Sequence, residues 1–206
     1  MRGYTFLFFL YTSFSLCAQI QHGSDDDKFR LIDAGLILGA NFSQVDGDNL
    51  DGFNKLGLNT GGIAHINFNP NWSLSFEILF SQKGSRTRPD PDLINTYKLV
   101  LNYADVPVAI NYKDRNRMIF SAGLAYGRLF SFAEYLNGNE TNFPNDPFKN
   151  DELSFHVGGT ILVGELKHFG VNFRYQQSLT TIGPSINPRV VGLTNKLLSL
   201  RGIYYF

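Results

Sequence analysis

Ser154 and His156 have the residue types of a catalytic nucleophile and its base, and they stand two positions apart. With Glu77 or Asp105 they would complete the hydroxyl, imidazole and carboxylate of a catalytic triad. Nothing in the surrounding sequence marks Ser154 as a nucleophile. We therefore favour a second interpretation, in which both side chains belong to a ring of polar residues inside the protein, and we predict no enzymatic activity.

The stretch DGDNLDG at residues 46–52 resembles a calcium-binding loop in its spacing of carboxylates. Its third carboxylate falls one position late, and no Glu stands at the closing position. We predict a solvated acidic loop and neither a metal site nor a cofactor. The glycine-spaced segments GLAYG and GGTILVG lie within expected strands, where Gly makes room or permits curvature, so no phosphate-binding loop is predicted.

Composition excludes one class of partner and favours one class of fold. The 18 basic residues balance the 18 acidic ones, so the sequence has no electrostatic signature of nucleic-acid binding. Hydrophobic residues make up 43%, aromatic residues make up 15%, and there are 20 glycines. This composition favours a single domain rich in strands and turns.

The N-terminal residues predict export. The apolar run YTFLFFLYTSFSLCA after Arg2 is too short for a spanning helix and is typical of a secretory signal peptide, which we place at residues 1–18. Cys17, the single cysteine, would leave with it, and Leu16 makes a lipoprotein signal a poor alternative. We expect a flexible periplasmic lead-in at 19–28 and one domain at 29–206.

Alternation of apolar and polar residues is the main structural signal. In NWSLSFEILFSQKGS, at 71–85, Trp72 and Phe76 belong to an apolar row that occupies every second position, which indicates a strand. The pattern recurs and predicts eight strands, at about 32–41, 56–69, 71–85, 97–112, 118–127, 153–163, 169–176 and 198–206. Leu99 and Leu101 are out of phase with the rest of the fourth strand, and a bulge near Asn102 would reconcile them.

The connections between strands alternate between short and long. NPN, KDRNR and GELKH are short, whereas the connections SQVDGDNLDGFNK, SRTRPDPDLINT, LNGNETNFPNDPFKND and TTIGPSINPRVVGLT are long and polar. This layout predicts an all-β fold: an eight-stranded antiparallel up-and-down transmembrane β-barrel in the outer membrane, with both termini periplasmic.

A soluble barrel of the lipocalin type is the alternative, and the two faces of the strands discriminate between them. The face with the charges also holds most Gly, Ser and Asn residues, which suits a narrow filled lumen, so the aromatic row should contact lipid. Three aromatic residues near the short turns should form a periplasmic girdle: Trp72, Tyr112 and Phe169. A C-terminal set resembles the signal read by the barrel-assembly machinery: Leu198, Leu200, Tyr204 and Phe206.

Counting residues from the short turns places several charged side chains at one height in the lumen. Buried charges must be paired, because an unpaired one retains much of its desolvation penalty. We therefore predict one salt-bridge network that plugs the barrel, made of Asp33, Glu77, Asp105, Arg174 and Arg201.

The order of motifs is similar to that of the PorT-type outer-membrane β-barrels of Bacteroidetes. The resemblance rests on LGANFS, FNKLGLNTGG, FEILFSQKGS, LNYADVPVAINY and FSAGLAYG. It implies an eight-stranded barrel, and some family members are linked to protein secretion. Three function classes follow: an anchor or accessory whose long loops or periplasmic rim contact a protein partner, a small gated channel, and a lipid-modifying enzyme. We favour the first, because side chains fill the interior of an eight-stranded barrel.

Overall fold

The computed structural model describes residues 30–48, 50, 52–88, 96–114, 117–141, 148–164, 168–184 and 192–206. Residues 1–29, which include the predicted signal peptide and lead-in, lie outside the described residues. Within the described ranges, no helix is long and apolar enough to cross a membrane.

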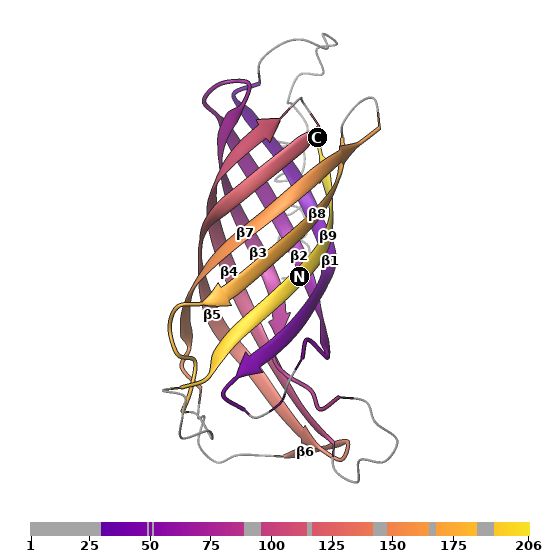
Figure 1. The fold of residues 1–206 in the computed structure, drawn as a ribbon, viewed down its shortest axis with the longest axis vertical. Helices are drawn as coiled ribbons and strands as arrows, with labels where there is room; N and C mark the ends of the chain where they lie inside the picture. The colour runs from indigo at the N-terminus through magenta and orange to yellow at the C-terminus, as the bar shows by residue number, and fades with distance from the viewer. Residues whose placement is uncertain are drawn as a thin grey trace, which may run out of the picture.

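Eight long strands and one short strand make up the structure. Their bounds are β1 Ile32–Asp46, β2 Lys55–Asn67, β3 Trp72–Lys83, β4 Tyr97–Asp114, β5 Met118–Leu136, β6 Asn139–Thr141, β7 Asp151–Val163, β8 Phe169–Ser178 and β9 Thr194–Tyr205. All pairings are antiparallel, in the order β4-β3-β2-β1-β9-β8-β7-β5-β6, and pairing of β4 with β5 closes the ring (Figure 1). The predicted eight-stranded antiparallel barrel is confirmed, and β6 is an additional short strand that pairs with β5.

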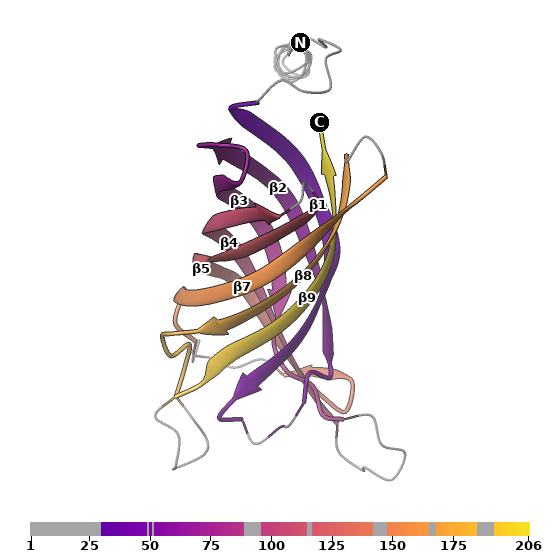
Figure 2. The ribbon, with the colours of Figure 1, turned by 45° about the horizontal axis from the view of Figure 1, so that its top comes forward.

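The barrel has a short-turn end and a long-loop end. The strand ends joined by the three short connections, of β2 with β3, β4 with β5, and β7 with β8, lie at the short-turn end, where β1 also begins and β9 ends (Figure 2). There the amide of Phe206 donates to the carbonyl of Ala34 at 3.0 Å, and Nη1 of Arg30 donates to the carbonyl of Phe206 at 2.8 Å. Strand β6 lies at the opposite, long-loop end.

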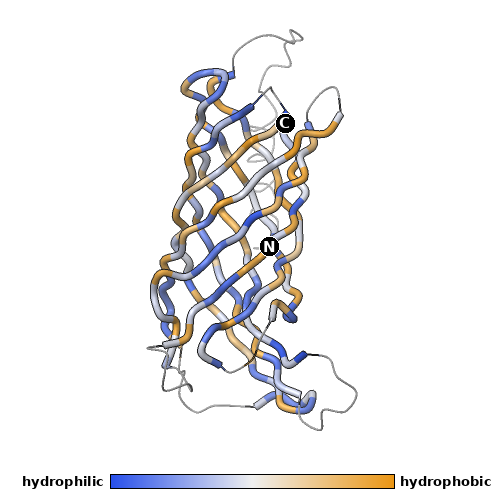
Figure 3. Tube along the Cα trace, in the orientation of Figure 1, coloured by the Kyte–Doolittle hydropathy of each residue, from blue (hydrophilic) through white to orange (hydrophobic). Residues whose placement is uncertain are grey.

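Large apolar side chains are exposed on the outside of the barrel and most polar side chains of the strands are buried inside it. Figure 3 shows hydrophobic and hydrophilic residues alternating along the strands. On β3, Phe76 is 39% exposed, whereas its neighbours Ser75 and Glu77 are each 2% exposed. Because the apolar row is on the outside, the lipocalin alternative is wrong. The outward apolar row of β3 runs from Trp72 to Phe80, which matches the roughly 9–11 residues that a tilted strand needs to cross a bilayer.

A belt of outward-facing polar side chains marks the long-loop edge of this apolar band. Neighbouring strands pair Gln82 with Asn102, and Arg128 with Asp151. The full polar belt is Gln44, Gln82, Asn102, Arg128, Asp151, Gln177 and Lys196. Beyond it, β4 and β5 continue as a pair of strands: β4 begins at Tyr97, as predicted, whereas β5 extends to Leu136, nine residues past the predicted end at residue 127.

The predicted bulge is present, but its role differs from the prediction. The register between β4 and β5 shifts at Asn102 and Tyr103, which pair with Ser131 and Leu129, so that Phe130 is the extra residue. Leu99 and Leu101 nevertheless face inward, in phase with Asp105. Past the polar belt the outer surface lies outside the hydrocarbon of the bilayer, so apolar side chains there gain by facing the lumen.

Candidate functional site

The short-turn half of the lumen contains a charged cluster that we call the Glu77 cluster. Glu77 of β3 accepts hydrogen bonds from Nη1 of Arg174 and Nη1 of Arg201, each at 3.0 Å, and from Nη2 of Arg174 at 2.5 Å. Arg201 also donates to Oδ1 of Asn172 through Nε at 2.9 Å and Nη2 at 2.7 Å. Two cations therefore share one carboxylate.

A second charged group, the Lys83 cluster, lies nearer the long-loop end. Nζ of Lys83 is 3.0 Å from Oδ1 of Asp105 and 3.0 Å from Oε2 of Glu152. Asn195 and Ser178 donate to the two oxygens of Glu152, and Lys83 lies 4.3 Å from the ring centre of Tyr103. Here two carboxylates share one cation, so the two clusters carry opposite excess charge.

This arrangement differs from the single network expected from the sequence. The structure brings Glu77, Arg174 and Arg201 together, but it places Asp105 with Lys83 and Asp33 near the short-turn rim. Asp33 accepts from Nδ2 of Asn67 at 2.8 Å and lies 3.9 Å from Arg30. Residue counting ignored the stagger between strands: Asp105 pairs with Leu79, two positions beyond Glu77 toward the long loops.

Sequence reasoning missed Lys83 and Glu152 as network members. The signal was present, because Lys83 is in phase with Glu77 on β3, and Glu152 is in phase with Ser154 on β7. Both have side chains without measurable exposure. An ionisable residue on the inward face of any strand should therefore be counted as a candidate for the lumen network.

The residues proposed as a triad do not form one. Oγ of Ser154 donates to the carbonyl of Ala125 at 3.3 Å and accepts from Nε2 of Gln176 at 2.8 Å. Both ring nitrogens of His156 are buried without a hydrogen-bond partner in the described part of the chain. His156 therefore does not act as a base toward Ser154 in this geometry.

Glycines opposite the charged side chains make room for them. Gly39 pairs with Arg201, and a Cβ at Gly39 would lie 2.4 Å from the carbonyl oxygen of Leu200 and 2.8 Å from Cγ of Arg201. Gly127 pairs with Asp105, and its Cβ would lie 2.5 Å from Oδ1 of that carboxylate. Gly127 thus leaves the space that the carboxylate of Asp105 occupies, whereas Gly39 permits the close approach of β9 as well as the Arg201 side chain.

A cluster of buried apolar side chains lies at the long-loop end of the barrel. We call this group the apolar cap: Val45, Leu99, Leu101, Tyr103, Leu129, Phe148, Ile182 and Leu193. All of them are buried, and Phe132 packs on Phe148 with the ring centres 5.3 Å apart. Side chains of several strands and of the segments next to β7 and β9 meet here, so the cap covers the Lys83 cluster from the loop side.

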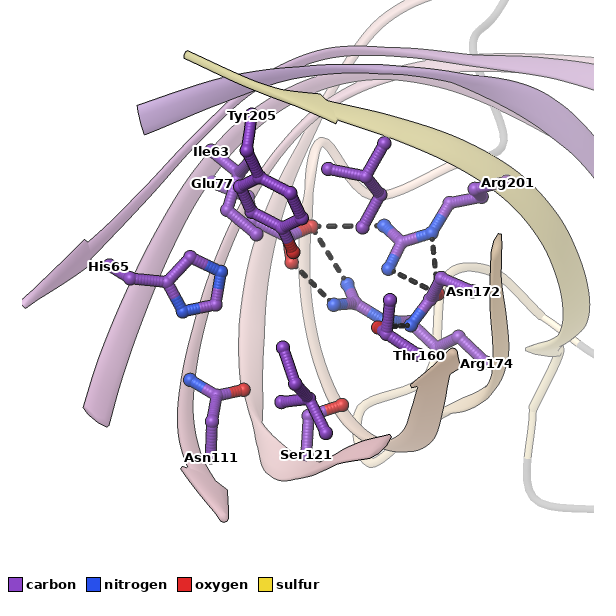
Figure 4. A pocket seen from close by; sticks show the side chains of 12 residues that line it. Ile63, His65, Glu77, Asn111, Ser121, Thr160, Asn172, Arg174, Arg201 and Tyr205 are labelled. Atoms are coloured by element: carbon purple, nitrogen blue, oxygen red, sulfur yellow. Dashed lines mark hydrogen bonds and ion pairs between the residues drawn. The ribbon is translucent and has the colours of Figure 1, made fainter. Parts of the chain in front are cut away.

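A small cavity at the short-turn end reaches the Glu77 cluster (Figure 4). His65, Asn111 and Tyr205 line it from the rim side, and Arg174 and Arg201 line its inner side. Its volume is about 10 Å³, which is room for about one water molecule. Such a cavity does not provide a path for hydrated ions.

The acidic loop shows no sign of a cation site in its described residues. Asp46 forms an ion pair with Lys196, and Oδ1 of Asp48 accepts from the amide of Leu50 at 2.9 Å. Burial raises the pKa of Asp48, which disfavours the ionised form that a metal requires. Across the described ranges, no group of three or more His, Cys, Asp or Glu side chains could hold a metal.

The aromatic residues expected near the short turns lie there and point outward. Trp72 pairs with Tyr112, and their ring centres are 5.1 Å apart. Phe169 pairs with Tyr204, which packs on Phe206 with ring centres 5.9 Å apart. Leu200, Tyr204 and Phe206 are exposed on the same outer surface, and Leu198 is half-buried there.

A closed eight-stranded barrel with an apolar exterior and a charged, filled interior defines the class of outer-membrane β-barrels. The family model described as outer membrane protein beta-barrel domain matches residues 17–182. The chain belongs to this family and is an outer-membrane protein.

Two solved structures of Ail, the attachment invasion locus protein of Yersinia pestis, are similar to this chain. The first has 13% identity and a TM-score of 0.52, covering 84% of this chain and 98% of Ail. The second, a complex with the heparin analogue sucrose octasulfate, has 13% identity and a TM-score of 0.53, covering 86% and 100%. At this identity the similarity shows the fold alone.

Neisserial surface protein A is a further similar structure, with 9% identity and a TM-score of 0.49, covering 87% of this chain and 100% of that one. No curated protein matches the chain.

Proposed function

We propose that this protein is a non-conducting, non-enzymatic barrel that is anchored in the outer membrane and presents its long loops to a protein partner. The filled lumen is the observation that carries the proposal. Glu77 of β3 is joined to Arg174 of β8 and Arg201 of β9 across the interior, and the apolar cap lies over the Lys83 cluster. A barrel closed in this way serves better as an anchor than as a pore.

The proposed orientation places the short-turn end, where β1 begins and β9 ends, in the periplasm. Short periplasmic turns and longer external loops are general in outer-membrane barrels. Trp72, Tyr112 and Phe169 would then form the periplasmic aromatic girdle. The outward row of Leu198, Leu200, Tyr204 and Phe206 would be the surface that the barrel-assembly machinery reads, so deletion of Phe206 should slow assembly.

Conductance measurements test the anchor against the channel. The purified protein in a planar bilayer should give no current steps, whereas a large porin in the same bilayer gives them. Regular openings of the wild-type protein would contradict the proposal and support the gated channel. Lipid A mass spectra from a deletion strain test the enzyme class, and we expect them to be unchanged.

Site-specific cross-linking tests for a partner and for the end at which it binds. A photo-reactive residue at Glu140, which is exposed on β6 at the long-loop end, should capture the same protein in repeated preparations. The matched positions are Ile78, which faces lipid, and Lys113, near the short-turn end of β4. Capture from Lys113 alone would move the partner to the periplasmic rim. A secretion component as partner would support the role that the PorT-type resemblance implies.

A further inference from the structure

Two basic side chains face each other on the outer surface near the long-loop end. Arg86 and Lys98 are directly opposite in an antiparallel bridge, and both are exposed. Backbone hydrogen bonds on either side fix the pair: the amide of Thr87 donates to Tyr97 at 2.9 Å, and the amide of Leu99 donates to Ser85 at 2.8 Å. Like charges directly opposite each other destabilise a strand pair.

Lys55, at the start of β2, is a third basic residue at this end of the barrel. Lys55 is 2% exposed, and its Nζ donates to the carbonyl of Leu56 at 2.7 Å and to Oε1 of Gln82 at 3.2 Å. Both acceptors are neutral, so they do not compensate its charge. Burial, and then repulsion by Lys98 and Arg86, lower the pKa of Lys55 to about 8, so it is still mostly cationic at neutral pH. The three side chains therefore build a region of positive potential.

In the described part of the chain, no carboxylate forms an ion pair with these three cations, although other cations at the same end have such a partner. Asp48 and Glu134 are near, but their side-chain hydrogen bonds are with Ser85 and Tyr97. Arg128 pairs with Asp151 at 2.8 Å, and Lys196 pairs with Asp46. Nζ of Lys98 instead lies 5.4 Å from the ring centre of Tyr135. Glu140 pairs with Tyr135 from the far side, two strands from Lys98, and in the described structure it forms no ion pair with that lysine.

The pair lies just beyond the polar belt, on the side of the long loops. Lys98 is four residues beyond Asn102 of the polar belt, on the same outward face of β4. At about 3.3 Å per residue and a tilt near 45°, this places the backbone of Lys98 roughly 9 Å beyond the polar belt. Long basic side chains bend toward the headgroup layer while their alkyl stems cover apolar surface.

We propose that Arg86 and Lys98, supported by Lys55, bind a phosphate group of a membrane lipid in the leaflet at the long-loop end. An arginine guanidinium presents two parallel donors to a phosphate, and a lysine ammonium adds a point charge. A phosphate between the two side chains converts their repulsion into two attractions. The site depends only on insertion of the barrel in a membrane. The identity of this leaflet as the outer one rests on the orientation given under the proposed function.

Native mass spectrometry of the full chain tests the proposal. The protein in neutral detergent is titrated with bisphosphorylated lipid A and, separately, with the same lipid after removal of its phosphates. We expect retention of the phosphorylated lipid, and roughly tenfold or greater weakening in the double variant R86Q/K98Q. The matched variant R128Q/K196Q removes the same charge at the same end from cations that already have carboxylate partners, and it should leave the affinity within about threefold.

Three outcomes would overturn the proposal. An equal loss of lipid affinity in both double variants would show that binding depends on net charge and not on this site. Equal retention of the dephosphorylated lipid would exclude phosphate recognition, and displacement by millimolar inorganic phosphate would indicate a site for free phosphate. Gel mobility before and after heating checks that each variant is folded. Because the measurement is made in detergent, a reversed orientation in the cell would change the leaflet and leave the binding result intact.

Discussion

Glu77 and Arg174 are 97 residues apart in the sequence and are joined by two hydrogen bonds across the lumen. Their strands, β3 and β8, are not neighbours, because β2, β1 and β9 separate them around the barrel. The pair therefore links opposite walls, and Arg201 of β9 adds a third strand to the link. Such cross-lumen contacts hold the barrel shut in addition to the hydrogen bonds between adjacent strands.

Removal of Glu77 should destabilise the barrel strongly. Glu77→Ala leaves Arg174 and Arg201 buried without a carboxylate, and we expect a loss of about 3–5 kcal/mol in the free energy of unfolding. Urea titration in detergent, followed by the heat-dependent shift in gel mobility, measures this loss. Glu140→Ala is the matched control, because it removes an exposed carboxylate. Similar losses in the two variants would show that the cross-lumen contacts contribute little.

The fold could be predicted because apolar and polar residues alternate along each strand. Once the side that faces lipid is known, this alternation fixes the direction of every side chain. The partners within the lumen could not be read in the same way. Which side chains meet depends on the stagger between strands, which placed Asp105 beside Lys83 rather than beside Arg174. Alternation carries no information on stagger.

The interior past the polar belt was a second gap in the prediction. Leu99 and Leu101 were treated as misplaced because apolar residues were expected to face lipid along the whole of β4. The strand extends beyond the apolar band. There, as in a soluble protein, apolar residues face the interior and polar residues face outward. The edge of the band is visible in the sequence only as a change in the outward residues, for example from Val106 to Asn102.

The facing of β3 is tested by charge and by labelling. Phe76→Arg places a cation on the lipid side and should cost roughly 2–4 kcal/mol near the bilayer midplane, and Phe120→Arg should behave alike. Cysteines at positions 75 and 76 provide the direct comparison in native membranes. A lipid-dissolved thiol reagent should label position 76 and leave position 75 unlabelled. The opposite pattern would reverse the assignment of the two faces.

Gly127→Ala tests the fit of the Lys83 cluster. The added methyl group would lie 2.5 Å from Oδ1 of Asp105 and 3.6 Å from Nζ of Lys83, so the ion pair must shift. We expect a loss of about 1–3 kcal/mol in the free energy of unfolding, as for other overpacked sites. Gly62→Ala is the matched control, since its methyl group meets only the carbonyl of Gly35, at 3.8 Å. Equal stability of the two variants would mean that the cluster tolerates displacement.

The apolar cap should contribute as a true hydrophobic core, and Leu101→Ala tests this. Leu101 has no measurable exposure within the cap, so truncation leaves a cavity and should cost about 2–5 kcal/mol. Val106→Ala on the outward face of the same strand is the control, because lipid fills the space that the lost methyl groups leave. Urea titration of both variants in the same detergent measures the difference. A Leu101→Ala loss no larger than that of Val106→Ala would show that the long-loop end is held by the strand hydrogen bonds alone.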